Sequence, residues 1–426
     1  MLTVTRGAAL YIGALIGPGL LLVPSLAADA AGPASIIAWA GLLILSAPLA
    51  VTFAALGVRH PVAGGVSAYV REAFGETAAA VTGVWFLTAV LFGAPAVALI
   101  GGYYVADLTD SGTGVAVAVG IAMYGTVLAA NAAGLRLSSG FQLVLSAVLV
   151  AVVAVAVTVA LPKHATDNWT PFAPHGWWAI GTAANILIWL FIGWEAMAQL
   201  AGDFRDPAHD LPRAMALAFA VITALYAGLA IATIVTATTG SRVPLADLIA
   251  VGFGRAGRDA TAVLAVALTM GTMNVYTGAA AKLAAALATE HALPRWFAGD
   301  AWRSIPRRPL LVFGVTAVFL LAGLAAGISS TSDLIRVTSA CFVLVYVLAL
   351  ASGLRLLTGR LRAAALVALA VICVVAVFSA GFLVVPAAAA VLVLAVRSRD
   401  AGGWARRRRL ARAPRSRSSS CPSSRS

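Results

Sequence analysis

The stretch Ile16-Gly17-Pro18-Gly19-Leu20-Leu21 interrupts the first apolar run of the chain, which covers about residues 8–28. Two glycines and a proline in close succession are expected to break an α-helix, because proline lacks a backbone N–H group and glycine is entropically costly in a helix. Non-helical backbone is tolerated in hydrocarbon only where it is buried in protein or lines a cavity. The stretch therefore predicts either a packing kink or a binding site at membrane depth.

The composition of the whole chain is typical of a membrane protein. Of 426 residues, 61% are apolar and 11% are charged, and the mean hydropathy is +0.96. A soluble protein of this size needs a larger charged surface. The net charge of +13 comes mainly from residues between apolar runs and from the C-terminal segment, so no nucleic-acid partner is expected. Three cysteines and five histidines are scattered, which predicts no metal site, disulfide framework or cofactor.

Repeated apolar runs predict an all-α integral membrane fold. A helix needs about 20 apolar residues to cross a bilayer, and about 12 transmembrane helices are expected, within a range of ten to twelve because the last two runs are short and share one apolar stretch. The predicted spans are about 8–28, 34–58, 77–106, 113–133, 138–161, 177–201, 213–239, 259–289, 309–328, 333–357, 361–378 and 380–396.

Lys and Arg residues predict the orientation of these spans. With the N-terminus in the cytoplasm, fourteen of them lie on the inner side before the tail and five on the outer side. Cytoplasmic loops are enriched in these residues, so we expect a multi-pass protein of the inner membrane with both termini cytoplasmic. The basic segment 397–426 is expected to be a disordered cytoplasmic tail. The outer connection 240–258 is expected to hold an amphipathic helix at the membrane surface.

The break in the first span would expose two helix ends to each other. The inner half-helix would end near Leu15 with unpaired carbonyl groups, which suit an ammonium group. The outer half-helix would start near Gly19 with unpaired N–H groups and a positive dipole end, which suit a carboxylate. The alternative to a kink is therefore a binding site for a zwitterion.

The sixth span contains a second possible break in Trp189-Leu190-Phe191-Ile192-Gly193-Trp194-Glu195. A lone carboxylate is expensive in hydrocarbon, so Glu195 is a candidate for binding a proton or for holding the break in shape. Its alternative is a protonated side chain that bonds a neighbouring carbonyl group. Breaks in spans 1 and 6 together indicate two five-helix repeats of opposite orientation.

Three polar residues in later spans are weaker candidates for the wall of a cavity. Asn274 and Tyr276 lie in the eighth span and Thr338 lies in the tenth. Each residue type is also common as a contact between packed helices.

With these features, the chain resembles the amino acid–polyamine–organocation (APC) superfamily of transporters, and within it the bacterial methionine and branched-chain amino acid exporters. The order and spacing of four stretches carry the resemblance. They are Ile16-Gly17-Pro18-Gly19-Leu20-Leu21, Pro61-Val62-Ala63-Gly64-Gly65-Val66-Ser67-Ala68-Tyr69-Val70, Phe191-Ile192-Gly193-Trp194-Glu195 with the following Asp203-Phe204-Arg205-Asp206-Pro207, and Asn274 with Lys282 and Leu293-Pro294.

The resemblance implies a LeuT-like 5+5 inverted repeat with broken helices 1 and 6. The repeats would cover about residues 8–161 and 177–357 of a transmembrane domain 1–396, with extra helices at about 361–396. It also implies roles for individual residues. The substrate-binding residues would be Leu15, Gly17, Gly19, Trp189, Ile192 and Gly193, with Glu195 supporting the second break or proton coupling, and Gly64 and Gly65 in the inner gate.

Two departures from the superfamily pattern affect these expectations. Pro18 stands where relatives often have Ser or Thr, so carboxylate binding would depend on Gly19 and the residues after it. Residues 138–161 contain no Lys that could replace a sodium ion.

The sequence thus favours a secondary transporter of neutral amino acids such as methionine and the branched-chain amino acids, with protons as the coupling ion. The direction, export, is implied by the family resemblance alone. The partners of the transporter would be the amino acid, protons and the lipid bilayer. Uptake or exchange of other amino acids or polyamines is the alternative within the same class. An enzyme is not expected, because no cluster of catalytic residue types lies at membrane depth. A non-transporting membrane protein would leave the paired breaks unexplained.

Overall fold

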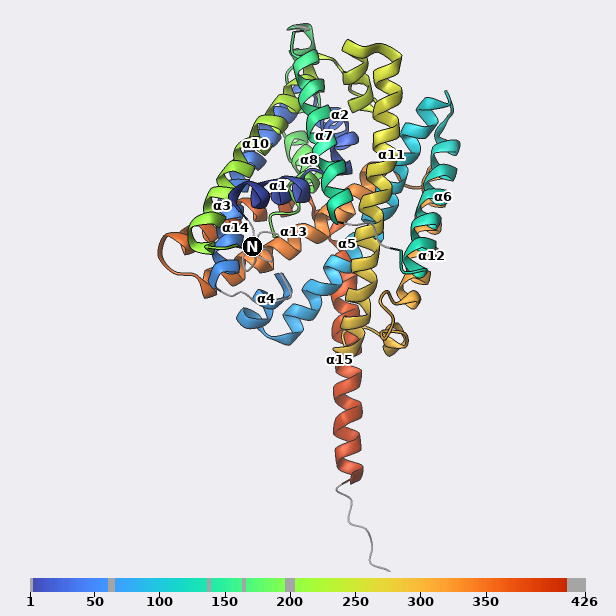
Figure 1. Ribbon diagram of the computed structural model, residues 1–426. Coiled ribbons are helices and arrows are strands. Elements are labelled where there is room, and N and C mark those ends of the chain that lie inside the picture. The colour runs from blue at the N-terminus through green and yellow to red at the C-terminus, as the bar shows by residue number, and fades with distance from the viewer. Residues whose placement is uncertain (1–2, 60–65, 136–138, 163–165, 196–203, 412–426) are drawn as a thin grey trace, which may run out of the picture.

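The computed structural model describes residues 3–59, 66–135, 139–162, 166–195 and 204–411, and its regular elements are helices gathered into one bundle (Figure 1). The α-helices are α1 (Val4–Leu15), α2 (Val23–Ala31), α3 (Ser35–Arg59), α4 (Val66–Phe74), α5 (Glu76–Leu108), α6 (Thr113–Ala132), α7 (Ser139–Ala160), α8 (Ala179–Leu187), α10 (Pro207–Val235), α11 (Pro244–Thr289), α12 (Arg307–Ala325), α13 (Thr331–Leu356), α14 (Gly359–Phe378) and α15 (Val384–Ala411). Short 3₁₀ turns lie at η1 (Pro18–Leu21), η2 (Gly32–Ala34), η3 (Thr166–Trp169), η4 (Ile188–Phe191), η6 (Arg295–Ala298) and η7 (Ala380–Phe382).

The described helices match a polytopic membrane protein in length and composition. Nine of them are long and apolar enough to cross a bilayer. Three shorter apolar helices cover Val4–Leu15, Ala179–Phe191 and Val384–Ser398. The first two are short because the chain breaks in the predicted spans 1 and 6.

Each half of the bundle contains a short helix that turns at a glycine into a long helix, and this shared feature indicates that the halves have the same architecture. In the first half, the short helix α4 turns at Gly75 (φ 87°) into the long helix α5. In the second half, a short helix from Pro244 turns at Gly254 (φ 58°) into the rest of α11. Glycine adopts positive φ without steric cost, which permits both sharp turns.

Close backbone contacts hold the centre of the bundle together. α5 packs against α6, α11 and α13, and most of its side chains are buried. A Cβ atom at Gly102 would lie 2.1 Å from the carbonyl oxygen of Ala116 on α6. Small residues allow this approach, which replaces the hydrophobic driving force that is missing between helices in lipid.

Two segments bear on the sequence-based expectations. The helix expected within 240–258 is present from Pro244, and one of its faces packs into the protein, with Leu245, Leu248 and Ile249 buried, while Val251 and Phe253 are exposed. α15 continues as a helix to Ala411 and projects from the bundle (Figure 1), so the predicted disordered tail is helical over 397–411. Alanine and arginine are strong helix formers, and the end of the apolar run marks only where the helix leaves the lipid.

Candidate functional site

The first break lies where the sequence predicts it. α1 ends at Leu15, and Ile16 and Gly17 are extended, with φ of −87° and −133°. Pro18 then opens η1, a position where its missing N–H group would be unpaired anyway. The backbone N–H groups of Gly17 and Gly19 donate to no residue that the structure describes. They are therefore free to meet a ligand.

The second break touches the first. η4 ends at Phe191, Ile192 is extended, and Gly193 has a φ of 132° that strongly favours glycine. A Cβ atom at Gly193 would lie 2.9 Å from the carbonyl oxygen of Ala14, and one at Gly19 would lie 2.7 Å from Leu190 Cδ2. Glycine at position 193 thus lets the backbones of the two interrupted helices meet, and glycine at position 19 leaves room for the Leu190 side chain.

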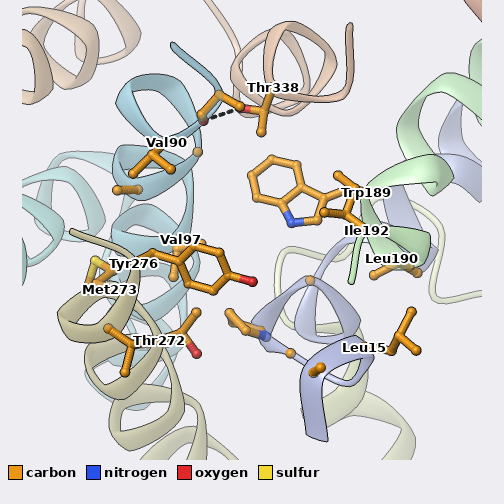
Figure 2. A pocket seen from close by; sticks show the side chains of 18 of the residues that line it. Leu15, Val90, Val97, Trp189, Leu190, Ile192, Thr272, Met273, Tyr276 and Thr338 are labelled. Carbon is orange, nitrogen blue, oxygen red and sulfur yellow. Dashed lines mark hydrogen bonds between the residues drawn. The ribbon is translucent and has the colours of Figure 1, made fainter. Parts of the chain in front are cut away.

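A cavity of about 300 Å³ opens at this meeting point (Figure 2). Trp189 from η4 and Tyr276 from α11 project into it from opposite sides (Figure 2). The predicted site residues that line the cavity are Leu15, Gly17, Gly19, Trp189, Ile192, Tyr276 and Thr338. The structure therefore brings together residues from both breaks and from two later helices.

The wall of the cavity is apolar and uncharged. None of the described residues that line it is acidic or basic, and α5 contributes only aliphatic and glycine surface. Its side-chain polar groups are the indole N–H of Trp189 and those of Gln142, Thr272, Tyr276 and Thr338. The Thr338 hydroxyl donates to the Leu334 carbonyl at 2.9 Å within its own helix. The described wall therefore offers a ligand no charged side chain.

Gln142 is a lining residue that sequence reasoning missed. Its Nε2 donates to the Thr272 hydroxyl at 3.3 Å, and its buried Oε1 has no partner among the described residues. The available signal was its place as a lone side-chain amide in the apolar run 138–161. Polar side chains inside a membrane span commonly mark functional sites.

Tyr226 of α10 is a second missed residue, and it joins the two breaks. Its hydroxyl lies 2.9 Å from the Leu190 carbonyl oxygen and 3.2 Å from that of Leu15. Both are orphan carbonyls of interrupted helices. A single hydroxyl proton serves one of them at a time, so one carbonyl always keeps both lone pairs open.

Glu195 lies behind the second break and does not line the cavity. Its Oε2 accepts from the Gly193 N–H at 2.9 Å and lies 2.5 Å from the Tyr346 hydroxyl. The same hydroxyl is 3.4 Å from the Phe191 carbonyl oxygen. The carboxyl group is thus bonded to the backbone that forms the break.

Comparison with known proteins identifies the group to which this architecture belongs. The sequence model of the amino acid permease family matches residues 2–398. The chain belongs to the amino acid permease family. This confirms the resemblance to the APC superfamily.

Two relatives cover most of this permease. It is 33% identical over 365 residues to an uncharacterised amino acid permease of Bacillus subtilis, YecA, covering 84% of this chain and 86% of the relative. It is 29% identical over 374 residues to the L-methionine/branched-chain amino acid exporter YjeH of Escherichia coli, covering 86% and 88%.

The fold of the permease also matches solved transporters. A manganese transporter of Eremococcus coleocola superposes with a TM-score of 0.52 at 14% identity, covering 93% of this chain and 92% of the other. At that identity the likeness concerns the fold alone. It confirms the all-helical, LeuT-like inverted repeat with interrupted helices.

Three of the described residues predicted for the site do not line the cavity: Gly193 and Glu195, which lie at the second break, and Asn274. Asn274 faces α6, where its Nδ2 donates to the Leu135 carbonyl at 3.4 Å and its own carbonyl accepts from Asn131 at 3.3 Å. It is not among the cavity residues. The sequence placed it correctly in a span, but helix rotation turns it toward a neighbouring helix.

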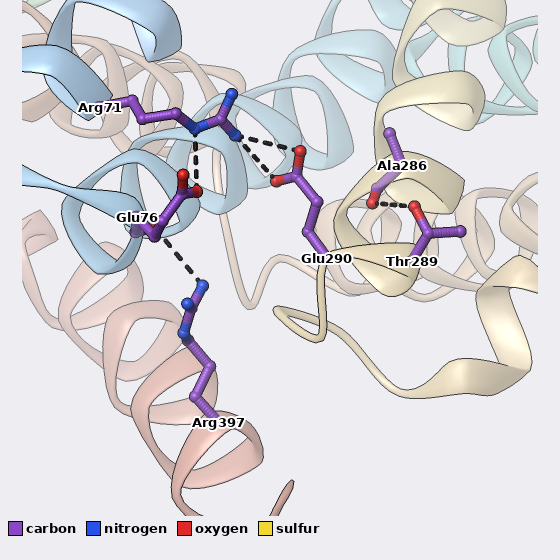
Figure 3. Close-up of polar contacts among 6 residues, drawn as sticks. All are labelled: Arg71, Glu76, Ala286, Thr289, Glu290 and Arg397. Atoms are coloured by element: carbon purple, nitrogen blue, oxygen red, sulfur yellow. Dashed lines mark hydrogen bonds and ion pairs between the residues drawn. The ribbon is translucent and has the colours of Figure 1, made fainter. Parts of the chain in front are cut away.

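The structure describes the helix that follows the predicted inner gate but not the gate residues themselves. Gly64 and Gly65 lie outside the described residues, and α4 begins directly after them. Arg71 at the end of α4 bonds Glu76 at 2.9 Å and Glu290 at 3.0 Å, which joins α4 to the start of α5 and the end of α11 (Figure 3). The gate prediction is untested, but the adjoining helix is tied to two long helices.

Proposed function

We propose that this permease is a secondary transporter that exports methionine and branched-chain amino acids in exchange for protons. It would work by alternating access in the inner membrane, with both termini in the cytoplasm. The observation that carries the proposal is the uncharged cavity between two broken helices. The named E. coli relative supports the choice of substrates.

Backbone groups would bind the part that all amino acids share. The N–H groups of Gly17 and Gly19 are unpaired and would receive the carboxylate, in keeping with anion binding at a helix start. The carbonyl groups of Leu15, Trp189 and Ile192 would receive the ammonium group. These paired sites select a zwitterion without any charged side chain.

The rest of the cavity would select the substrate side chain. Its described walls carry no carboxylate that could pair with a second positive charge, and an unpaired charge is costly at this depth. Aliphatic and aromatic groups such as Val90, Val97 and Phe342 suit an apolar side chain. Trp189 is placed to cover a bound ligand. Cationic amino acids and polyamines are therefore less suitable.

Glu195 would couple the proton to the shape of the second break. When ionised, it accepts from both Tyr346 and the Gly193 N–H. When protonated, it can donate to the Tyr346 oxygen, and Tyr346 can then donate to the Phe191 carbonyl. Proton binding would thus move a hydrogen bond onto the backbone that lines the substrate site.

Flux measurements in proteoliposomes test the proposal. The full-length protein is reconstituted, labelled methionine or leucine is loaded, and a proton gradient is imposed. We expect gradient-dependent flux that other branched-chain amino acids inhibit and arginine does not. Flux of arginine or a polyamine, with none of methionine or leucine in a folded preparation, would refute the assigned substrate class in favour of cationic substrate exchange.

A further inference from the structure

A second hollow lies on the outside of the bundle, between α6 and α12. It has a volume of about 740 Å³. Aliphatic and aromatic side chains of both helices line it, and one basic residue lies at its end. The lining includes Leu128, Ala132, Arg307, Leu311, Val315 and Phe319. Leu311, Val315 and Phe319 are 64%, 56% and 74% exposed. The groove therefore faces the surroundings of the bundle and not its core.

The groove has the length of one lipid leaflet. Arg307 is the first residue of α12, and Phe319 is twelve residues further along. At about 1.5 Å per residue, the two are about 18 Å apart along the axis. Half of a hydrocarbon core of about 30 Å is about 15 Å. An acyl chain that starts at Arg307 would therefore end near Phe319.

The basic end of the groove carries the Arg307 guanidinium in a position that suits an anion. Arg307 Nε donates to the Ala132 carbonyl at 3.1 Å, which fixes the guanidinium beside α6 and leaves its two outer nitrogens available. No carboxylate of the described residues forms an ion pair with Arg307. One oxygen of the nearby Asp300 accepts from the backbone N–H groups of Arg307 and Arg308, and the other is buried without a partner among the described residues, so the carboxylate caps the start of α12 and forms no ion pair with the Arg307 guanidinium.

Neighbouring residues extend this end into an interfacial patch. Arg303 lies over the Trp302 ring at 4.5 Å, and Arg308 lies over Trp296 at 5.6 Å. Trp302 is 76% exposed and Trp296 is 47% exposed. Tryptophan and arginine are typical of the headgroup level of a membrane. The groove thus joins a cationic, aromatic end to an apolar channel.

We propose that this groove is a binding site for an anionic phospholipid of the cytoplasmic leaflet. The lipid phosphate binds Arg307, and an acyl chain follows Leu311, Val315 and Phe319 along α12. Basic pockets between membrane helices on the cytoplasmic side are suited to such headgroups. The assignment of the leaflet rests on the proposed orientation, whereas binding of the lipid does not.

Charge favours a lipid over a second copy of the chain. A two-fold contact through this face would use the same patch on both copies. An axis along the membrane normal would bring Arg303, Arg307 and Arg308 of one copy near those of the other, with like charges opposed. An anionic headgroup neutralises them instead.

Native mass spectrometry of the full-length protein tests the site. The purified protein is titrated with phosphatidylglycerol and, separately, with phosphatidylcholine. We expect tighter binding of phosphatidylglycerol, and a loss of about fivefold in that binding for Arg307→Gln, since one arginine near a membrane surface contributes about 1 kcal/mol. Arg255→Gln, an exposed arginine on α11, is the control and should bind as the wild type does.

A second variant tests the apolar part of the site. Val315→Trp fills the groove from its exposed side and should reduce binding of both lipids while the thermal midpoint is kept. Equal binding of the two lipids by the wild type, or an unchanged preference in Arg307→Gln, would refute the site. A dimer that Val315→Trp dissociates would show that a second copy occupies the face. None of these outcomes depends on transport, so a failure of the lipid site can be distinguished from a failure of the proposed transport function.

Discussion

At the scale of single residues, Glu195 is a predicted site residue that lies behind the cavity and not in its wall. The sequence places it beside the second break, and the structure shows it bonded to the Gly193 N–H and to Tyr346 behind the cavity. Any effect of Glu195 on the substrate site would therefore pass through the backbone of the second break.

Glu195→Gln should separate coupling from substrate binding. Glutamine keeps the shape of the side chain but cannot release a proton, so we expect gradient-driven flux to be lost while exchange of methionine across the membrane persists. Both are measured in proteoliposomes over a range of pH. If the variant keeps the pH dependence of the wild type, Glu195 does not carry the coupled proton.

Tyr226→Phe should weaken the junction of the two breaks. It removes the hydroxyl that serves the Leu15 and Leu190 carbonyls, and an unsatisfied buried group costs about 1–3 kcal/mol. We expect a lower thermal midpoint and weaker methionine binding. Tyr11→Phe is a matched control, because the Tyr11 hydroxyl is buried without a partner among the described residues. Equal effects of the two variants would contradict the role of Tyr226.

At the scale of elements, the contact of α4 with α5 and α11 links the predicted gate to the rest of the bundle. Arg71 makes both of its ion pairs near the surface, with side chains that are 40% to 62% exposed. Exposed pairs of this kind contribute less than about 1 kcal/mol to stability. The ion pairs would therefore serve mainly to hold α4 in position against α5 and α11.

Arg71→Gln should therefore affect transport more than stability. We expect a slower rate of methionine flux with a thermal midpoint close to that of the wild type. Glu290→Gln should also slow flux, and the double variant should be no slower than Arg71→Gln, because that single variant already removes the contact with Glu290. Additive losses would indicate that the two residues act independently.

At the scale of the whole molecule, the bundle has two sides, and the proposed export direction depends on which one faces the cytoplasm. Ser111 lies between α5 and α6 on the predicted outer side, and Ser304 precedes α12 on the predicted inner side. Both are exposed. They form a pair of similar serines on opposite sides.

Cysteine labelling of this pair reports the orientation. In a background with Cys373→Ser and Cys421→Ser, a membrane-impermeant maleimide should label Ser111→Cys in intact cells. Ser304→Cys should be labelled only after the membrane is opened. Cys341 is buried and should stay unlabelled in both cases. The opposite pattern would reverse the topology and place the lipid groove in the outer leaflet.

The sequence predicted the parts of the fold that depend on local chemistry. Apolar runs of sufficient length predicted the helices, and Gly17, Pro18 and Gly193 predicted the two breaks, because backbone freedom and missing donors act on the residue itself. Trp189, Tyr276 and Thr338 were also predicted for the site, and they line the cavity. The helical continuation of α15 differs from the prediction, because a change from apolar to polar residues does not by itself end a helix.

Local residue patterns are thus sufficient to predict a helical membrane protein with interrupted first and sixth spans. The face that each helix turns inward follows from packing between helices. This packing brought Gln142 and Tyr226 to the site from α7 and α10, turned Asn274 toward α6, and set Glu195 behind the break. In a span that is apolar on all sides, hydrophobic periodicity cannot fix rotation. Close packing of small residues and pairing of orphan backbone groups fix it instead, and both depend on contacts between distant parts of the chain.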